Sequence, residues 1–207
     1  LTVSKGAMSD DETKTHLFAV SGGREPLTTV ASGTVSGDLY VGAFQTVPFG
    51  NQPASGITFR EFDQPFSIPS SAVRNIQWAR LFVTTYSGSA SNSYGHRQTI
   101  SFDGNGDAVY ETTLGVEDCD IAAEGNGNSY PLNDHVTKVF SDYEAWYDVT
   151  GLITATNPAA RIRTEQITGK SYDGRLKAVT LVVAYNDGDT DQVKYWVNHG
   201  HDWINSG

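Results

Sequence analysis

The residues best suited to chemistry form two sets of alternating acidic and amide side chains. Asp103, Asn105 and Asp107 occur in SFDGNGDAV, and Asp187, Asp189 and Asp191 occur in YNDGDTDQV. Oxygen ligands on alternate residues are typical of calcium-binding loops. Neither stretch has the Glu at the twelfth position that an EF-hand supplies, and Asn-Gly and Asp-Gly pairs are also ideal for hairpin turns. A calcium site in at least one loop and two plain turns are therefore both open.

A third acidic stretch is a weaker candidate for calcium. It is GVEDCD, which contains Glu117, Asp118 and Asp120.

Imidazole and aromatic side chains are concentrated in KYWVNHGHDWINSG, residues 194–207. His199 and His201 could chelate zinc or a similar metal, but two ligands are too few and the other histidines lie at no ligand spacing. We favour a structural role, in which Gly200 makes a sharp turn, neighbouring side chains bond backbone groups, and Trp rings cover an end of the core. The predicted clasp consists of Trp196, His199, His201, Asp202 and Trp203.

No catalytic constellation can be recognised in the sequence. There is no G-x-S-x-G motif, and the acidic neighbours of Cys119 disfavour a reactive thiolate. The spacing of carboxylates across strands, which a glycosidase would require, cannot be read from sequence. We therefore predict that the protein is not an enzyme.

Composition limits the partners and the setting. The 207 residues carry a formal charge of -10 and contain no Lys/Arg cluster, which argues against nucleic acid and anionic membranes as partners. No apolar run is long enough to span a bilayer. The chain starts at Leu1 and has its only Met at position 8, so we expect an exported mature product. A single cysteine, Cys119, is then either buried or bridges two subunits.

Eight stretches between turn-forming segments alternate apolar with polar residues or are rich in β-branched and aromatic residues. They are residues 38–44, 57–62, 78–86, 97–102, 107–114, 144–154, 160–167 and 175–185. This spacing predicts an all-β fold, a two-sheet antiparallel β-sandwich or jelly roll. The apolar stretch 175–185 should lie mid-sheet. The last strand should form a hairpin with residues 176–186, and Tyr195 and Val197 should share one face of it.

The supply of aromatic residues raises the question of sugar binding. Four Trp and ten Tyr could form a stacking surface for pyranose rings. Trp78 and Trp146, however, lie among apolar neighbours in predicted strands, so we expect them in the core.

Four stretches carry a family resemblance: GTVSGDLYVGAF, WARLFVTTYSGS, AWYDVTGLI and DGRLKAVTLVVAYNDGDTDQVKYWVNHGHDWI. They resemble the DUF3344 family of secreted and cell-surface proteins of methanogenic archaea, over most of residues 33–204. Ala79 to Val83 and Asp148 to Ile153 are more loosely similar to galactose-binding-like jelly-roll modules. The resemblance implies a surface β-sandwich and no known catalytic function. We therefore expect one domain, residues 33–207, after an N-terminal extension, residues 1–32.

The predicted role is that of an extracellular cell-surface protein that assembles with identical subunits into a filament, sheath or surface layer, or is displayed as an adhesive module. A carbohydrate-binding module is the alternative. The extension contains THLFAV, which alternates polar and apolar residues before Gly22-Gly23 and could be donated as a strand to a neighbouring copy. The predicted assembly residues are Thr15, His16, Leu17, Phe18, Ala19, Val20 and Cys119.

Overall fold

The computed structural model describes residues 25–45, 53–124 and 129–201, and these residues are nearly all β. The strands are β1 (Glu25–Val35), β2 (Leu39–Gln45), β3 (Phe59–Pro65), β4 (Ile76–Tyr86), β5 (Gly95–Asp103), β6 (Thr112–Asp120), β7 (Ser129–Pro131), β8 (Val136–Val139), β9 (Asp142–Asp148), β10 (Ala159–Gln166), β11 (Arg175–Tyr185) and β12 (Val193–His201). Two short helices, α1 (Ser70–Val73) and α2 (Ile121–Glu124), lie between strands. Among the described residues, no helix has the length and apolarity needed to cross a membrane.

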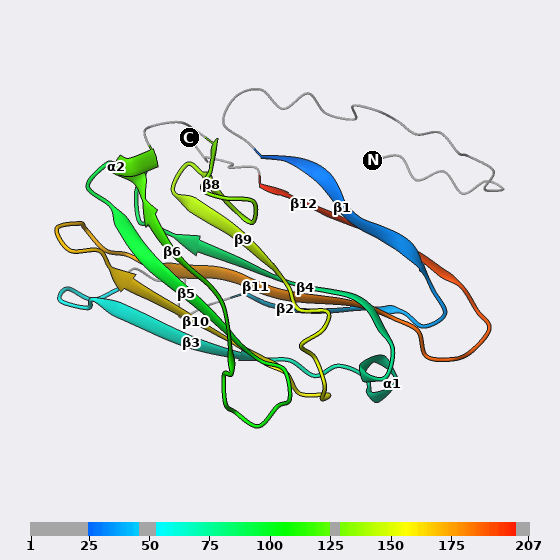
Figure 1. The fold of residues 1–207 in the computed structure, drawn as a ribbon. Helices are drawn as coiled ribbons and strands as arrows, with labels where there is room; N and C mark the ends of the chain where they lie inside the picture. Colours follow the sequence, from blue (N-terminus) through cyan, green and yellow to red (C-terminus); the bar gives the residue numbers. More distant parts are fainter. Residues whose placement is uncertain (1–24, 46–52, 125–128, 202–207) are drawn as a thin grey trace.

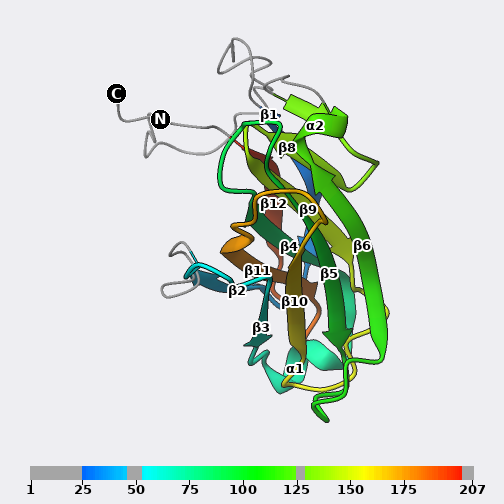
Figure 2. The ribbon, with the colours of Figure 1, turned by 90° about the vertical axis from the view of Figure 1, so that its left-hand side faces the viewer.

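Two sheets form the sandwich. One has the strand order β3-β10-β5-β6, and the other has the order β2-β11-β4-β9-β8-β7. All paired strands are antiparallel. Both sheets can be followed in Figures 1 and 2. The prediction of an antiparallel β-sandwich is confirmed.

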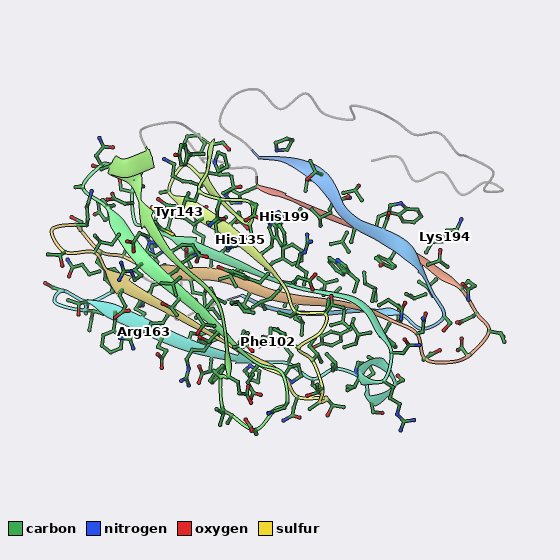
Figure 3. All side chains as sticks on the ribbon, in the orientation of Figure 1. Phe102, His135, Tyr143, Arg163, Lys194 and His199 are labelled. Atoms are coloured by element: carbon green, nitrogen blue, oxygen red, sulfur yellow. The ribbon has the colours of Figure 1, made fainter. Side chains whose placement is uncertain are left out.

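The core lies between the two sheets and follows from the alternation of each strand. In β4, Ala79, Leu81 and Val83 are buried, whereas the residues between them are only half-buried. Phe102 of β5, labelled in Figure 3, is fully buried as part of the facing layer. Period-two burial of this kind is what a strand with one core-facing side requires.

Strand β11 is mid-sheet, as its sequence predicts, between β2 and β4. Val179, Leu181 and Val183 are buried in the core, and Val182 and Ala184 on its other face are also buried. Apolar residues on both faces are expected of a strand that is covered on both sides.

A third layer covers the outer face of the six-stranded sheet. β1 and β12 form a two-stranded antiparallel sheet, hereafter the ribbon, which is seen above the sandwich in Figure 1. The prediction that the last strand forms a hairpin with residues 176–186 is therefore wrong. The physical reason is that both edges of β11 are already paired, so β12 is carried past it and pairs with β1.

The ribbon also contradicts the expected domain boundary at residue 33. β1 runs from Glu25 to Val35 without a break at residue 33, so the expected domain boundary falls inside a paired strand. Residues 1–24, including the predicted donor segment Thr15 to Val20, lie outside the described residues.

Candidate functional site

The ribbon is attached to the sandwich by a cluster of charged side chains. Asp142 and Glu144 alternate along β9, so both project from the outer face of the six-stranded sheet. His199 and His201 alternate in the same way along β12 and are half-buried against that face. Figure 3 labels His199 near the end of β12. These four residues bring the ribbon and the sheet together.

His201 lies between the two carboxylates. Its Nε2 is 3.0 Å from Asp142 Oδ2, and its Nδ1 is 3.2 Å from Glu144 Oε1. The hydrogen bond to Asp142 raises the pKa of His201, against the opposing effect of burial. With both ring nitrogens beside carboxylates, His201 is placed to act as an imidazolium.

His199 is held mainly by packing. Its ring stacks on Phe82 of β4 with 5.0 Å between centroids. Its Nε2 is 3.7 Å from Glu144 Oε2 and has no hydrogen-bond partner among the described residues. The buried carboxylates have further partners in the sheet: Lys177 Nζ donates to Asp142, and Thr84 Oγ1 donates to Glu144.

Both histidines of the predicted clasp lie at the contact between the ribbon and the sheet, but the predicted details are wrong. Gly200 lies inside β12 rather than in a sharp turn, and His201 contacts carboxylates rather than backbone groups. Trp196 points away from the sheet with 64% of its surface exposed, so it covers none of the described core. Asp202 and Trp203 lie outside the described residues.

Exposure along β12 alternates as the sequence predicts. Tyr195 and Val197 are half-buried, whereas Lys194, Trp196 and Asn198 are exposed. Lys194 is labelled near the other end of the strand in Figure 3.

The first predicted calcium loop brings carboxylates together. Ligand oxygens of Asp103, Asp107 and Glu111 all lie within 4.8 Å of one another. The Asn105 amide donates to Asp107 Oδ2 at 3.2 Å and to Glu111 Oε1 at 2.7 Å. A cation bound at this place would balance the negative charge of these two carboxylates. Glu111 was missed by the sequence analysis, although it stands eight residues after Asp103 in the same loop.

Asp103 organises the backbone of this loop. Its buried carboxylate accepts hydrogen bonds from the backbone N–H groups of Asn105, Gly106 and Ala108. Gly106 and Ala108 both have positive φ, the conformation in which short loops turn back. The oxygen donors and the compact loop fit a hard cation such as calcium.

The other predicted calcium stretches are less compact. Asp189 hydrogen-bonds Asp191 and thereby raises the pKa of Asp191, but Asp187 does not complete a three-carboxylate group with them. The third stretch forms strand β6, in which Asp118 pairs with Arg97 and Asp120 with Lys170. These aspartates form ion pairs and do not belong to a loop that could supply several ligands to a cation.

A shallow pocket of about 240 Å³ opens between β6, β9 and the turn that precedes β8. Its lining comprises Leu114, Asp134, His135, Trp146, Tyr147 and Asp148. His135, labelled in Figure 3, lies 2.8 Å from Asp134 Oδ1 and 3.1 Å from Glu117 Oε1. Burial alone would lower the pKa of His135, but these two hydrogen bonds outweigh it and raise the pKa.

A buried polar network extends from this pocket into the core. Glu117 accepts hydrogen bonds from Tyr147 and Gln98, and Gln98 accepts one from Thr85. Thr85 then contacts His96, which is fully buried; burial lowers the pKa of His96 to about 3. The network thus holds a neutral histidine inside the sandwich.

Trp78 and Trp146 are not core residues, contrary to prediction. Both are half-buried on the outer face of the six-stranded sheet, on either side of Arg80. The Arg80 guanidinium lies 3.8 Å from the centre of the Trp146 ring and 5.4 Å from that of Trp78. Cation–π stacking on Arg80 thus helps to accommodate both indoles on this face.

Cys119 is fully buried, which confirms burial and rules out the predicted bridge between subunits in this fold. Its side chain lies in the core between the two sheets.

Comparison with protein families gives one result. A model of the family described as "Protein of unknown function (DUF3344)" matches residues 21–207. The chain belongs to the DUF3344 family. The match begins upstream of residue 33, where the resemblance was expected to begin, and it includes the whole of β1, in agreement with the pairing of β1 and β12. No curated protein and no solved structure is detectably similar to this DUF3344 chain.

Proposed function

We propose that this DUF3344 protein is an extracellular, non-enzymatic cell-surface subunit, of archaeal origin, that assembles with identical copies into a filament, sheath or surface layer. The observation that carries the proposal is the ribbon. Within the described residues, β1 and β12 pair only with each other, so each has one side with no neighbouring strand. Unpaired strand edges are templates for another chain.

The antiparallel pairing of the ribbon suits repeated addition. A copy that is shifted sideways without rotation presents its β1 antiparallel to the free edge of β12. The sheet then continues as β1-β12-β1-β12 through successive copies. Such a head-to-tail contact does not close, and open polymers result.

Other edges of the sandwich carry features that discourage pairing. β3 has three charged residues and ends at Pro65, β6 contains a bulge, and β7 has three residues. Charges, proline, bulges and short length are recognised protections of edge strands. β2 lacks them, but it is shorter than either ribbon strand and offers a single edge.

Substitutions on the exposed ribbon test this proposal. Leu27 and Trp196 are 69% and 64% exposed, and a Leu27→Lys/Trp196→Lys variant places charge on both strands. We expect purified wild-type protein to form polymers by light scattering and electron microscopy, and the variant to stay monomeric.

Val116→Lys and Val41→Lys are matched controls, because each residue is a 56% exposed apolar side chain on another edge strand. Both controls should still polymerise. A wild-type protein that stays monomeric, or a Val41→Lys variant that alone blocks polymers, would overturn the ribbon mechanism.

Strand donation by Thr15 to Val20 is a second route to the same assembly. Removal of residues 1–23 leaves β1 complete and separates the two routes. Polymerisation of the truncated protein favours edge addition, whereas a folded monomer favours donation.

Carbohydrate binding is the second candidate function, and the pocket at His135 favours it. Aromatic and carboxylate side chains together suit sugars, because rings pack on C–H faces and carboxylates accept hydroxyl hydrogen bonds. Trp146, Asp134 and Asp148 supply both kinds of group. Arg80 stacks on Trp146, however, so that ring is not an unoccupied platform.

A titration of Trp fluorescence with a panel of oligosaccharides tests this candidate. A saturable change that is lost in Asp134→Asn/Asp148→Asn, and kept in Asp187→Asn/Asp189→Asn, supports a sugar site in the pocket. No change across the panel leaves assembly as the remaining function.

Calcium is the cofactor that we propose for the loop of Asp103, Asn105, Asp107 and Glu111. It would neutralise neighbouring carboxylates and tie β5 to the start of β6, which stabilises a surface protein without taking part in a reaction.

A further inference from the structure

A histidine lies at the contact between the ribbon and the six-stranded sheet, beside two buried carboxylates. Asp142 and Glu144 are both buried, at 2% and 7% exposure, on a face that the ribbon covers. Buried carboxylates require charge partners or hydrogen-bond donors. From the position of the His201 ring between these two carboxylates, we infer that His201 is a proton-operated latch that holds the β1–β12 ribbon on the six-stranded sheet.

The charges in the cluster balance only while the latch is protonated. Asp142 and Glu144 carry two negative charges, and Lys177 with an imidazolium at His201 carries two positive charges. Lys177 Nζ is 2.6 Å from Asp142 Oδ1, so Asp142 keeps a partner when His201 is neutral. A neutral His201 ring has only one N–H, so it can donate to Glu144 or to Asp142 but not to both, and the interface then holds one unbalanced negative charge.

Among the described residues, the charged and titratable neighbours of His201 come from three strands. β9 contributes Asp142 and Glu144, β11 contributes Lys177, and β12 itself contributes His199. Phe82 and Thr84 of β4 carry no charge. Glu25 of β1 is the register partner of His201.

The direction of the pH effect follows from linkage. The folded pKa of His201 is raised, mainly by Asp142, above the value of about 6.5 of an unfolded histidine. The latch therefore contributes fully below pH 6.5, and its contribution is lost as the pH rises through the folded pKa. The ribbon should loosen in mildly alkaline solution, while the two-sheet core keeps its packing. The latch acts whether or not copies of the chain assemble.

Hydrogen exchange tests the latch when rates are corrected for the intrinsic effect of pH. Experiments use the full chain kept monomeric by low concentration, at pH 6 and pH 9. We expect protection of β1 and β12 amides to fall relative to β4 and β11 between pH 6 and pH 9, because the raised pKa of His201 places the loss of its proton in this direction. Equal protection of the ribbon at both pH values in the wild-type protein would overturn the inference.

Three variants assign the effect to His201. His201→Gln should give low ribbon protection that no longer changes with pH. His199→Gln removes the stacked neighbour and should keep the pH dependence. His135→Gln should keep it too, because this histidine of raised pKa bonds Asp134 and Glu117 rather than the carboxylates beneath the ribbon. A pH dependence that survives in His201→Gln contradicts the latch. If His201→Gln fails to fold, an NMR titration of His201 in the wild-type protein decides, since a pKa at or below 6.5 also contradicts it.

Discussion

Gly200 of β12 lies against Leu27 of β1 so closely that a Cβ at position 200 would stand 2.8 Å from the Leu27 Cα. The same Cβ would lie 2.7 Å from the carbonyl oxygen of Pro26. These contacts are with backbone atoms, so a side chain at position 200 can be fitted only if the two strands separate. The glycine between the two histidines therefore permits close pairing of the ribbon rather than a turn.

Gly200→Ala should loosen the ribbon by about 1–3 kcal/mol, the usual cost of forcing extra atoms into a packed site. Limited proteolysis or hydrogen exchange of β1 and β12 measures the change. Gly151→Ala is the control, because a Cβ there meets no atom within 4 Å. Equal ribbon protection in the two variants would show that the close approach is not limiting.

Calcium should raise the melting temperature relative to a chelator. A ligand that binds only the folded state at one hundred times its Kd stabilises by about 2.7 kcal/mol, which is roughly 5–10 °C for a domain of this size. Asp107→Asn/Glu111→Gln should abolish the difference, because these residues belong to the carboxylate group. Asp187→Asn/Asp189→Asn should preserve it. An unchanged melting temperature with calcium and with chelator counts against the site.

The position of this loop shows where sequence patterns mislead. Residues 107–114 alternate like a strand, yet β6 begins at Thr112 because Asp103 accepts three hydrogen bonds from the preceding loop. Local alternation cannot reveal a carboxylate that fixes the backbone several residues away. Strands β4, β5, β10 and β11, in contrast, were predicted to within a few residues, because burial on the core side imposes their period.

The ribbon cluster shows the same limit at longer range. The spacing of His199 and His201 indicated a structural clasp, and both do hold the ribbon. Their partners Asp142 and Glu144 belong to β9, which is far from β12 in the sequence. A hairpin of β12 with the strand that precedes it in the chain was the simpler expectation. Strand order depends on which edges are already paired, and single-sequence patterns carry no record of that.

His96 should make the protein less stable in acid. Its folded pKa of about 3, set by burial, lies below the unfolded value of about 6.5, so its contribution is present above pH 6.5 and is lost as the pH falls. At pH 5 the loss is about 2 kcal/mol relative to pH 7. Urea unfolding at both pH values measures it, and His96→Gln should show a smaller difference between them. An identical difference in both proteins would mean that His96 is not held neutral.

Cys119 should be unreactive in the folded protein, because its side chain is fully buried. A thiol reagent should modify it only after denaturation, and polymers should dissociate equally in detergent with or without reductant. Rapid modification of native protein, or a subunit ladder that only reductant removes, would restore the covalent bridge between subunits.

The central claim is that copies join through the edges of the ribbon, and hydrogen exchange of polymer against monomer tests it most directly. Backbone groups on the unpaired sides of β1 and β12 become hydrogen-bonded when strands of neighbouring copies pair. The account predicts that the polymer gains amide protection in β1 and β12, with β3 and β6 unchanged. Protection gained at β2, β3 or β6 while the ribbon amides exchange as in the monomer would contradict it.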